Sequence, residues 1–382
     1  MMHDWLNALI KGIGLTLFFS TSLAYSYEFQ PRIVGGVESS VQDWQFMAAL
    51  MPPSESAGEL TVGFDQFDAI VMSGSPARRF VGNLANCDLA QSTCPDVDGK
   101  VCLITRGDNT FAEKVSNCAA GGGIAAIIFN NTFGLFQGIV DADTPRIPAV
   151  SISDTDGSAL LDLLGQEVSF EVTSRRASRS FCGGSYIGGK WILTAAHCVT
   201  DAELKEISDP ATIEVNIGGH DLATDLDNVI AVKRIEVHQD YNFKVPPIND
   251  LALLELESEP KGVASVALAS RALLNLQISE GRNATAIGRG LQDIFELGET
   301  LRGSTTSRLF EVELPLVSNE VCNAEFNALA TKAEERNPVT PEMMCAGGDR
   351  NFGTCAGDSG GPLLLLDNDE YKIAGLTSWG IG

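Results

Sequence analysis

Apolar and polar positions in the N-terminal half predict a compact α/β unit. Residues 101–104 and 124–129 are short apolar runs typical of buried strands. Between them, Thr110 and Glu113 have the spacing of a capping box at the start of a helix, and glycines 121–123 end it. One face of this helix carries Phe111, Val115 and Cys118 or Ala119. A further strand and helix are predicted at residues 147–152 and 157–164.

In the C-terminal half, two buried strands lie next to chemically active side chains. Residues 191–193 form an apolar strand that runs into a turn of small residues ending at His197. Residues 251–254 predict a second buried strand, and Asp250 stands at its mouth, where burial is costly without a partner. The other histidines, His3, His220 and His238, lie in the leader or in polar contexts.

The composition is that of an acidic chain with enough apolar residues to form more than one hydrophobic core. The 382 residues are 44% hydrophobic and carry a formal net charge of −24. This charge argues against nucleic acid or an anionic membrane surface as a partner. Nine cysteines favour an oxidising compartment.

A serine nucleophile is indicated within residues 353–362, which read Gly-Thr-Cys-Ala-Gly-Asp-Ser-Gly-Gly-Pro. The glycines let the main chain approach a substrate closely, and the N–H groups of Gly357 and Ser359 can turn toward one point to stabilise an oxyanion. A serine hydroxyl needs a base, and the base needs an orienting group. His197, Asp250 and Ser359 supply these in the order His, Asp, Ser.

Five stretches together resemble the chymotrypsin/trypsin family of serine peptidases: residues 33–36, 193–198, 249–254, 357–362 and 378–380. The resemblance implies a mainly β fold of two six-stranded antiparallel β-barrels, the second incomplete at the C-terminus. It makes His197 the general base, Asp250 its orienting group and Ser359 the nucleophile, with Gly357 and Ser359 as the oxyanion hole. Ser378, Trp379 and Gly380 would pair with the substrate backbone. Protein or peptide substrates and hydrolysis without a cofactor follow.

The first residues are expected to direct secretion. Residues 1–26 read as a signal peptide whose apolar run is too short for a membrane anchor, which predicts an extracellular or periplasmic protein. Residues 27–32 would be a short propeptide. By resemblance, cleavage after Arg32 frees the amino group of Ile33, which pairs with Asp358 and orders the oxyanion loop. The protein would thus be a zymogen.

The peptidase pattern covers residues 33–54, stops, and resumes in 176–382, so the intervening residues are expected to fold as an inserted domain whose ends lie close together. Residues 58–173 resemble the protease-associated domain. That resemblance implies selection of substrates or partners, or restricted access to the cleft. The alternative is a tolerated surface insertion without function.

Cysteine pairing follows the same division. The resemblance implies bridges Cys182–Cys198 and Cys322–Cys345. Four cysteines, Cys87, Cys94, Cys102 and Cys118, are confined to the insert and permit three pairings. Cys355 is left over. Its family partner comes just after the point where the sequence stops at Gly382, which we interpret as the end of a fragment.

Gly353, at the base of the specificity pocket by resemblance, has no charge. With Thr354 beside it and Gly380 leaving the wall open, the pocket favours an apolar or small side chain, unless a carboxylate enters from beyond Gly382. Activation after Arg32 would then need another peptidase. Arg289 stands where the family usually has tryptophan. Gly219 stands where calcium-binding members have an acidic ligand, and the nearby Asp221, Asp225 and Asp227 are interpreted as a solvated acidic loop, so no metal is expected.

Two other functional classes compete with a peptidase. A catalytically silent binding protein would use the insert and keep the peptidase fold as a scaffold, but the triad residues are all present. An esterase would need a G-x-S-x-G elbow on an α/β sheet, and the residue order does not fit it.

Overall fold

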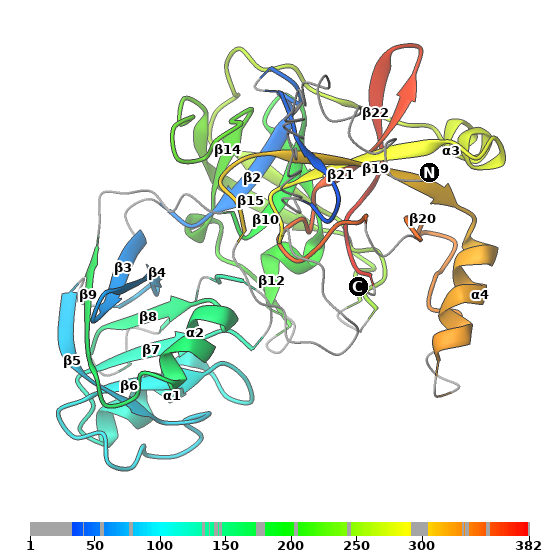
Figure 1. Ribbon diagram of the computed structural model, residues 1–382. Coiled ribbons are helices and arrows are strands. Elements are labelled where there is room, and N and C mark those ends of the chain that lie inside the picture. The colour runs from blue at the N-terminus through cyan, green and yellow to red at the C-terminus, as the bar shows by residue number, and fades with distance from the viewer. Residues whose placement is uncertain are drawn as a thin grey trace, which may run out of the picture. The chain divides into compact units, whose positions relative to one another are not determined.

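The structure is a computed structural model that describes residues 33–380, apart from residues 41, 54–56, 76–78, 132–133, 137, 141–143, 145–146, 173–179, 202–204, 243–245, 292–304, 331, 333–335 and 349–351. The expected signal peptide 1–26 and propeptide 27–32, including Arg32, lie outside the described residues. Figure 1 shows a chain built mainly of strands. The expected mainly β fold with an α/β insert is confirmed.

Six antiparallel strands close one barrel in the order β10, β11, β16, β15, β14, β2. They are β2 (Met47–Met51), β10 (Cys182–Gly188), β11 (Trp191–Thr194), β14 (Glu214–Ile217), β15 (Val229–Val237) and β16 (Ala252–Leu256). Short elements lie between them: η1 (Ala196–Val199), β12 (Thr200–Asp201), β13 (Glu206–Ile207) and η2 (Pro210–Thr212). Alternate residues of β16 point inward, so Ala252, Leu254 and Leu256 are buried in the barrel core.

The second part of the peptidase fold is an open sheet in the order β1, β19, β18, β21, β22, β17, with β20 paired to β19. Its elements are β1 (Val37–Glu38), β17 (Ala267–Leu268), α3 (Arg271–Ser279), β18 (Asn283–Gly288), β19 (Phe310–Val317), α4 (Asn319–Leu329), β20 (Cys345–Ala346), β21 (Pro362–Asp367) and β22 (Glu370–Leu376). Serines cap both helices: Ser270 accepts from Leu273 N–H and Ser318 from Val321 N–H.

Between β2 and β10 the chain forms a third structure of its own. Seven strands close a mixed barrel in the order β3, β4, β8, β7, β6, β5, β9. They are β3 (Ala57–Val62), β4 (Asp65–Val71), β5 (Arg79–Asn86), β6 (Val101–Thr105), β7 (Ala125–Phe129), β8 (Ala149–Ile152) and β9 (Glu167–Val172), with helices α1 (Phe111–Ala120) and α2 (Asp154–Leu161) beside β6 and β7 (Figure 1). β6 and β7 are parallel, as a β-α-β unit requires.

The ends of this insert lie side by side, as an insertion requires. Gly58 of β3 is paired with Val172 of β9. In the peptidase barrel, Leu50 of β2 is paired directly with Cys182 of β10. The chain can therefore leave one barrel strand, complete the insert, and return to the neighbouring strand.

Helix α1 begins as its sequence predicts. Thr110 Oγ1 accepts a hydrogen bond from Glu113 N–H, and the Glu113 carboxylate accepts one from Thr110 N–H. These two bonds form the capping box. The structure also chooses among the disulfide pairings that the sequence leaves open. Cys87 is bonded to Cys94, and Cys102 to Cys118, which ties α1 to β6.

Lys114 of α1 is fully buried, which is unusual for an ammonium group. Its Nζ donates to Leu89 O at 2.6 Å, Gly107 O at 2.7 Å and Asn109 Oδ1 at 2.6 Å. The sites of all three protons are thus occupied, and one side chain ties the helix to two neighbouring loops.

We expect Lys114→Met to destabilise the insert by about 3 kcal/mol, because it leaves one buried and two part-buried acceptors without this donor. Urea unfolding of the full chain would measure the change. Lys100→Met is the matched control, since Lys100 Nζ makes one exposed bond to Asp96 O. An equal loss of unfolding free energy in the two variants would show that the contacts of Lys114 stabilise the insert no more than the exposed bond of Lys100 does.

Candidate active site

Strand register brings His197 and Asp250 together. Thr194, the last residue of β11, is paired with Ala252, the first of β16. Because the strands are antiparallel, the residues after β11 and those before β16 emerge at the same end of the barrel. His197 lies in η1 and Asp250 precedes β16, so the two side chains meet there.

The Asp250 carboxylate holds His197 at two points. Oδ1 accepts from the main-chain N–H of His197 at 2.8 Å, and Oδ2 lies 2.7 Å from Nδ1. The hydroxyl of Ser378 donates to Oδ2 at 2.5 Å. These bonds fix the ring and favour the tautomer with a proton on Nδ1, which leaves Nε2 able to accept a proton.

Electrostatics keeps this carboxylate ionised. Burial alone would raise the pKa of Asp250, but the hydrogen bonds and charge of His197, with the bond from Ser378, bring that pKa below its usual range. An ionised Asp250 would stabilise an imidazolium at His197.

The loop that carries Ser359 is fixed from both parts of the peptidase fold. Ser359 O accepts from Gly183 N–H at 2.7 Å, and Gly360 N–H donates to Thr377 O at 2.8 Å. Gly360 has φ +77°, and a Cβ there would lie 2.3 Å from Thr194 Oγ1. Glycine is therefore required directly after the serine.

The disulfide between Cys182 and Cys198 completes this frame. Cys182 precedes Gly183, which binds the Ser359 carbonyl, and Cys198 follows His197. Within the described part of the chain, no hydrogen bond joins Ser359 to His197, whose Nε2 instead lies 3.8 Å from Cys198 Sγ. Nucleophile and base often engage fully only when substrate is bound.

The residues expected to form the oxyanion hole have a suitable conformation. Gly357 has φ +98°, and the turn is held by Asp358 N–H donating to Cys355 O at 3.0 Å. Among the described residues, no acceptor contacts the N–H of Gly357 or of Ser359. Two donors are therefore available to a developing oxyanion.

Asp358, the residue before Ser359, has a buried side chain. It is fully buried, accepting from Gly290 N–H at 2.7 Å and Cys355 N–H at 2.9 Å. Burial raises the pKa of Asp358 to about 6, although these hydrogen bonds and the charge of Arg289 oppose the shift. Ile33 is also fully buried, and the carbonyl of the next residue, Val34, accepts from Gly353 N–H at 3.0 Å.

The expected specificity residues surround open space. A Cβ on Gly353 or Gly380 would meet no atom within 4 Å. Trp379 packs against Phe326 of α4, with ring centroids 5.2 Å apart. Thr354 follows Gly353 and is partly exposed. A disulfide between Cys322 and Cys345 ties α4 to β20 in this part of the fold.

One cluster has metal-ligating residue types: Cys182, His197 and Cys198 offer atoms within 4.8 Å of one another. The two sulfurs are already joined in a disulfide, so neither is a thiolate ligand. Within the described residues, no helix has the length and apolar character needed to cross a membrane.

Three contributors were not identified from the sequence. The sequence pattern indicates only a substrate-pairing strand for Ser378, yet its hydroxyl donates a hydrogen bond to Asp250. Gly290 binds Asp358, and Gly183 binds the Ser359 carbonyl. Gly290 and Gly183 donate through their main-chain N–H groups, and nothing in the sequence except a glycine marks such a contact.

Arg289 occupies a site that the family pattern gives to tryptophan, and its guanidinium is buried. It donates to Ser307 O at 3.2 Å and makes a short hydrogen bond to Gly219 O. Burial lowers the pKa of Arg289 to about 10, while Asp221, Asp225 and Asp358 act in the opposite direction. The side chain stays cationic and links the two parts of the peptidase fold.

Comparison with known proteins identifies two family models that match this chain. The trypsin family model matches residues 165–382, and the PA domain model matches residues 70–160. Protein masquerade of Drosophila melanogaster is 34% identical over 209 residues, which are 53% of this chain and 18% of that protein. Limulus clotting factor C of Carcinoscorpius rotundicauda is 31% identical over 210 residues, 52% of this chain and 19% of that protein.

The secreted serine protease VesC from Vibrio cholerae is similar among solved structures, at 32% identity and a TM-score of 0.40, covering 54% of this chain and 39% of that chain. The chain spans about a fifth of the length of the curated relatives it matches. The trypsin model covers more than half of the chain, with the PA domain in addition. The chain therefore belongs to the trypsin family of serine endopeptidases.

Proposed function

We propose that this protein is a secreted serine endopeptidase, acting outside the cell or in a periplasm, that cleaves protein or peptide substrates through an acyl-enzyme. The observation that carries the proposal is the double contact of Asp250 with His197, at Nδ1 and at the main-chain N–H. This arrangement leaves Nε2 as the base beside a serine loop fixed from both parts of the peptidase fold.

In the proposed reaction, Ser359 Oγ attacks the substrate carbonyl while His197 Nε2 accepts its proton. The N–H groups of Gly357 and Ser359 stabilise the oxyanion. His197 then donates the proton to the leaving amine, which departs and leaves an ester on Ser359. Water, activated by His197, hydrolyses that ester. Asp250 holds the imidazolium throughout.

The same proposal makes the uncleaved chain a zymogen. After cleavage at Arg32, the new ammonium group of Ile33 would pair with Asp358. Both Ile33 and Asp358 are already buried, and the Val34 carbonyl contacts Gly353 at the pocket base. A buried carboxylate gains most from a cation in such surroundings. Because Gly353 is uncharged, another peptidase would perform this cleavage.

The PA domain is proposed to span residues 58–173, between peptidase segments 33–54 and 176–382. Its proposed role is to select substrates or partners, or to limit access to the cleft. Its closed barrel and paired ends allow it to fold as a unit while interrupting the chain only once. Clotting factor C is named as a clotting protein, and a similar proteolytic cascade is one setting in which an activating peptidase would be available.

Fluorophosphonate labelling tests catalysis directly. We expect Ser359 to be labelled only after limited cleavage at Arg32, because the oxyanion loop needs the Ile33 ammonium. Ser359→Ala should abolish the label. Labelling is read by in-gel fluorescence before and after cleavage. A folded, cleaved protein that takes no label would favour the catalytically silent binding protein instead.

The pH dependence of stability tests the role of Asp358 in the uncleaved chain. Its folded pKa of about 6 lies above the unfolded value of about 3.9. The folded state therefore binds the extra proton, and stability falls as pH rises from about 4 to about 6, by about 3 kcal/mol. Asp358→Asn should remove this part of the slope in urea unfolding.

The control for this measurement is Asp43→Asn, which removes an exposed carboxylate. Cleavage at Arg32 should also reduce the Asp358 part of the slope, because the Ile33 ammonium then pairs with the carboxylate. An identical slope in parent and Asp358→Asn would refute the assignment.

Substitution at the pocket base tests specificity. We expect the cleaved parent to prefer peptide substrates with an apolar or small residue before the scissile bond. Gly353→Asp should raise kcat/KM for arginine substrates by about a hundredfold, since the new carboxylate pairs with the guanidinium. Open space around Gly353 admits the side chain.

The neutral control is Gly353→Asn. In the Gly353→Asp variant alone, pure protein should activate itself at Arg32 at a rate that rises with protein concentration. Efficient self-activation of the parent would show that its pocket already accepts arginine.

A further inference from the structure

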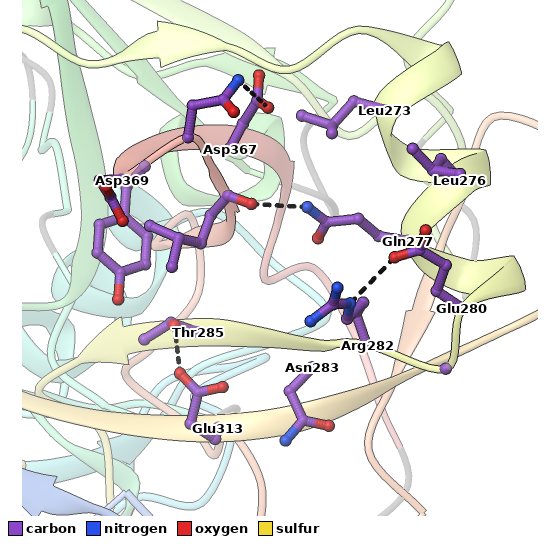
Figure 2. Close-up of a pocket in the computed structure, with 14 residues that line it drawn as sticks. Leu273, Leu276, Gln277, Glu280, Arg282, Asn283, Thr285, Glu313, Asp367 and Asp369 are labelled. Atoms are coloured by element: carbon purple, nitrogen blue, oxygen red, sulfur yellow. Dashed lines mark hydrogen bonds and ion pairs between the residues drawn. The ribbon is translucent and has the colours of Figure 1, made fainter.

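A groove of about 640 Å³ lies on the peptidase fold, outside the catalytic residues (Figure 2). One wall is helix α3, the opposite wall is the turn between β21 and β22, and residues of β18 and β19 lie between them. Leu276 and Gln277 face the groove from α3, and Asp367 and Asp369 from the turn.

The walls are held in place by specific contacts. Gln277 Nε2 donates to Leu366 O at 2.7 Å, which joins the helix to the hairpin. Asn368 and Asp369 have φ values of +51° and +67°, the left-handed pair of a tight two-residue hairpin turn. The groove is therefore a formed surface feature before any partner binds.

Apolar side chains in the groove remain open to solvent. Leu276 is 54% exposed, Leu366 48% and Tyr371 36%. The Tyr371 ring is supported by Trp44, with ring centroids 4.6 Å apart in an edge-on arrangement. Burying these side chains under a partner would be favourable, and the supported ring loses little freedom on binding.

The charges around these apolar groups are mainly negative. Glu280 is paired with Arg282 at 3.0 Å, and Asp367 with Lys372 at 2.5 Å. Glu313 accepts from Thr285 at 2.5 Å. In the part of the chain that the structure describes, no basic side chain forms an ion pair with Glu313 or Asp369.

We propose that this groove docks a segment of a protein substrate in which lysine or arginine alternates with aliphatic residues. Glu313 and Asp369 would bind the cations, and Leu276, Leu366 and Tyr371 would cover the aliphatic groups. The inference deepens the proposed function by naming a class of substrate, and it rests on that function. A second copy of this chain is a poor occupant, because its net charge of −24 opposes approach to an acidic groove.

The hairpin connects this groove to the catalytic residues. β21 begins three residues after Ser359, and β22 ends two residues before Ser378. Six extended residues span about 20 Å, so a substrate held at the turn has its docking segment about that far from the scissile bond. A separate docking segment of this kind would select folded or long substrates over short peptides.

Binding is tested in the full chain carrying Ser359→Ala, so that no catalysis is needed. The probe is a fluorescein-labelled peptide, Gly-Leu-Lys-Leu-Arg-Leu-Gly, followed by fluorescence anisotropy. We expect saturable binding that weakens at high salt. Adding Glu313→Gln and Asp369→Asn together should weaken it about tenfold, whereas Glu370→Gln, a neighbouring turn carboxylate outside the groove, should not. Both groove substitutions keep a hydrogen-bonding side chain of similar size.

Each other outcome overturns the proposal. Equal binding by the groove variant and the Glu370→Gln control would place the peptide elsewhere, the catalytic cleft included. Equal binding of the analogue with glutamates in place of lysine and arginine would remove charge recognition. If titration calorimetry shows that calcium binds at the groove and the peptide does not, the groove is a cation site. Fluorophosphonate labelling of the parent protein, which keeps Ser359, tests the proposed peptidase function without using the groove. Failure of the docking proposal can therefore be distinguished from failure of the proposed function.

Discussion

The buried carboxylate of Asp358 is the constraint on which the catalytic half of the molecule depends. Placing an acid in an interior is costly, and burial raises its pKa to about 6 despite hydrogen bonds from Gly290 and Cys355. Those bonds fix the main chain directly before Ser359. The turn that carries Ser359 is thus held by a carboxyl group that has no direct ion pair among the described residues, so a cation placed beside it would favour its ionised form.

The pKa of the second buried acid, Asp250, is shifted in the opposite direction. It is also buried, yet its pKa is lowered because His197 and Ser378 contact the carboxylate directly. The pKa of Asp250 is therefore lowered and that of Asp358 raised, although both carboxyl groups are buried. The difference arises because Asp250 accepts from the side chains of His197 and Ser378 as well as from the His197 main chain, whereas the hydrogen bonds to the fully buried Asp358 come from main-chain N–H groups.

Much of the fold could be predicted because it depends on local patterns. The capping box of Thr110 and Glu113 and the parallel strands around α1 follow from residue spacing. The pairing of Gly58 with Val172 follows from the need for an insert to return to its starting point. The predicted triad residues depend on strand register as well, since only pairing of β11 with β16 brings His197 to Asp250.

What the sequence could not supply are contacts made through main-chain atoms or between distant loops. The choice of Cys87–Cys94 and Cys102–Cys118 among three pairings depends on where β6 and α1 lie in three dimensions. Ser378 is 128 positions from Asp250, and no periodicity links them. The buried Lys114 is a further case, because its partners include two carbonyl oxygens that any residue could provide.

The replacement at Arg289 shows how such contacts could alter regulation without changing the catalytic residues. Its guanidinium binds carbonyls from both parts of the peptidase fold, and its charge acts on Asp358. An apolar side chain there would exert no such field. The charge of Arg289 therefore offsets part of the cost of burying Asp358. In the proposed zymogen switch, this would narrow the free-energy gap between the uncleaved and cleaved states of the oxyanion loop, and the strength of the switch would depend on two buried groups rather than on Asp358 alone.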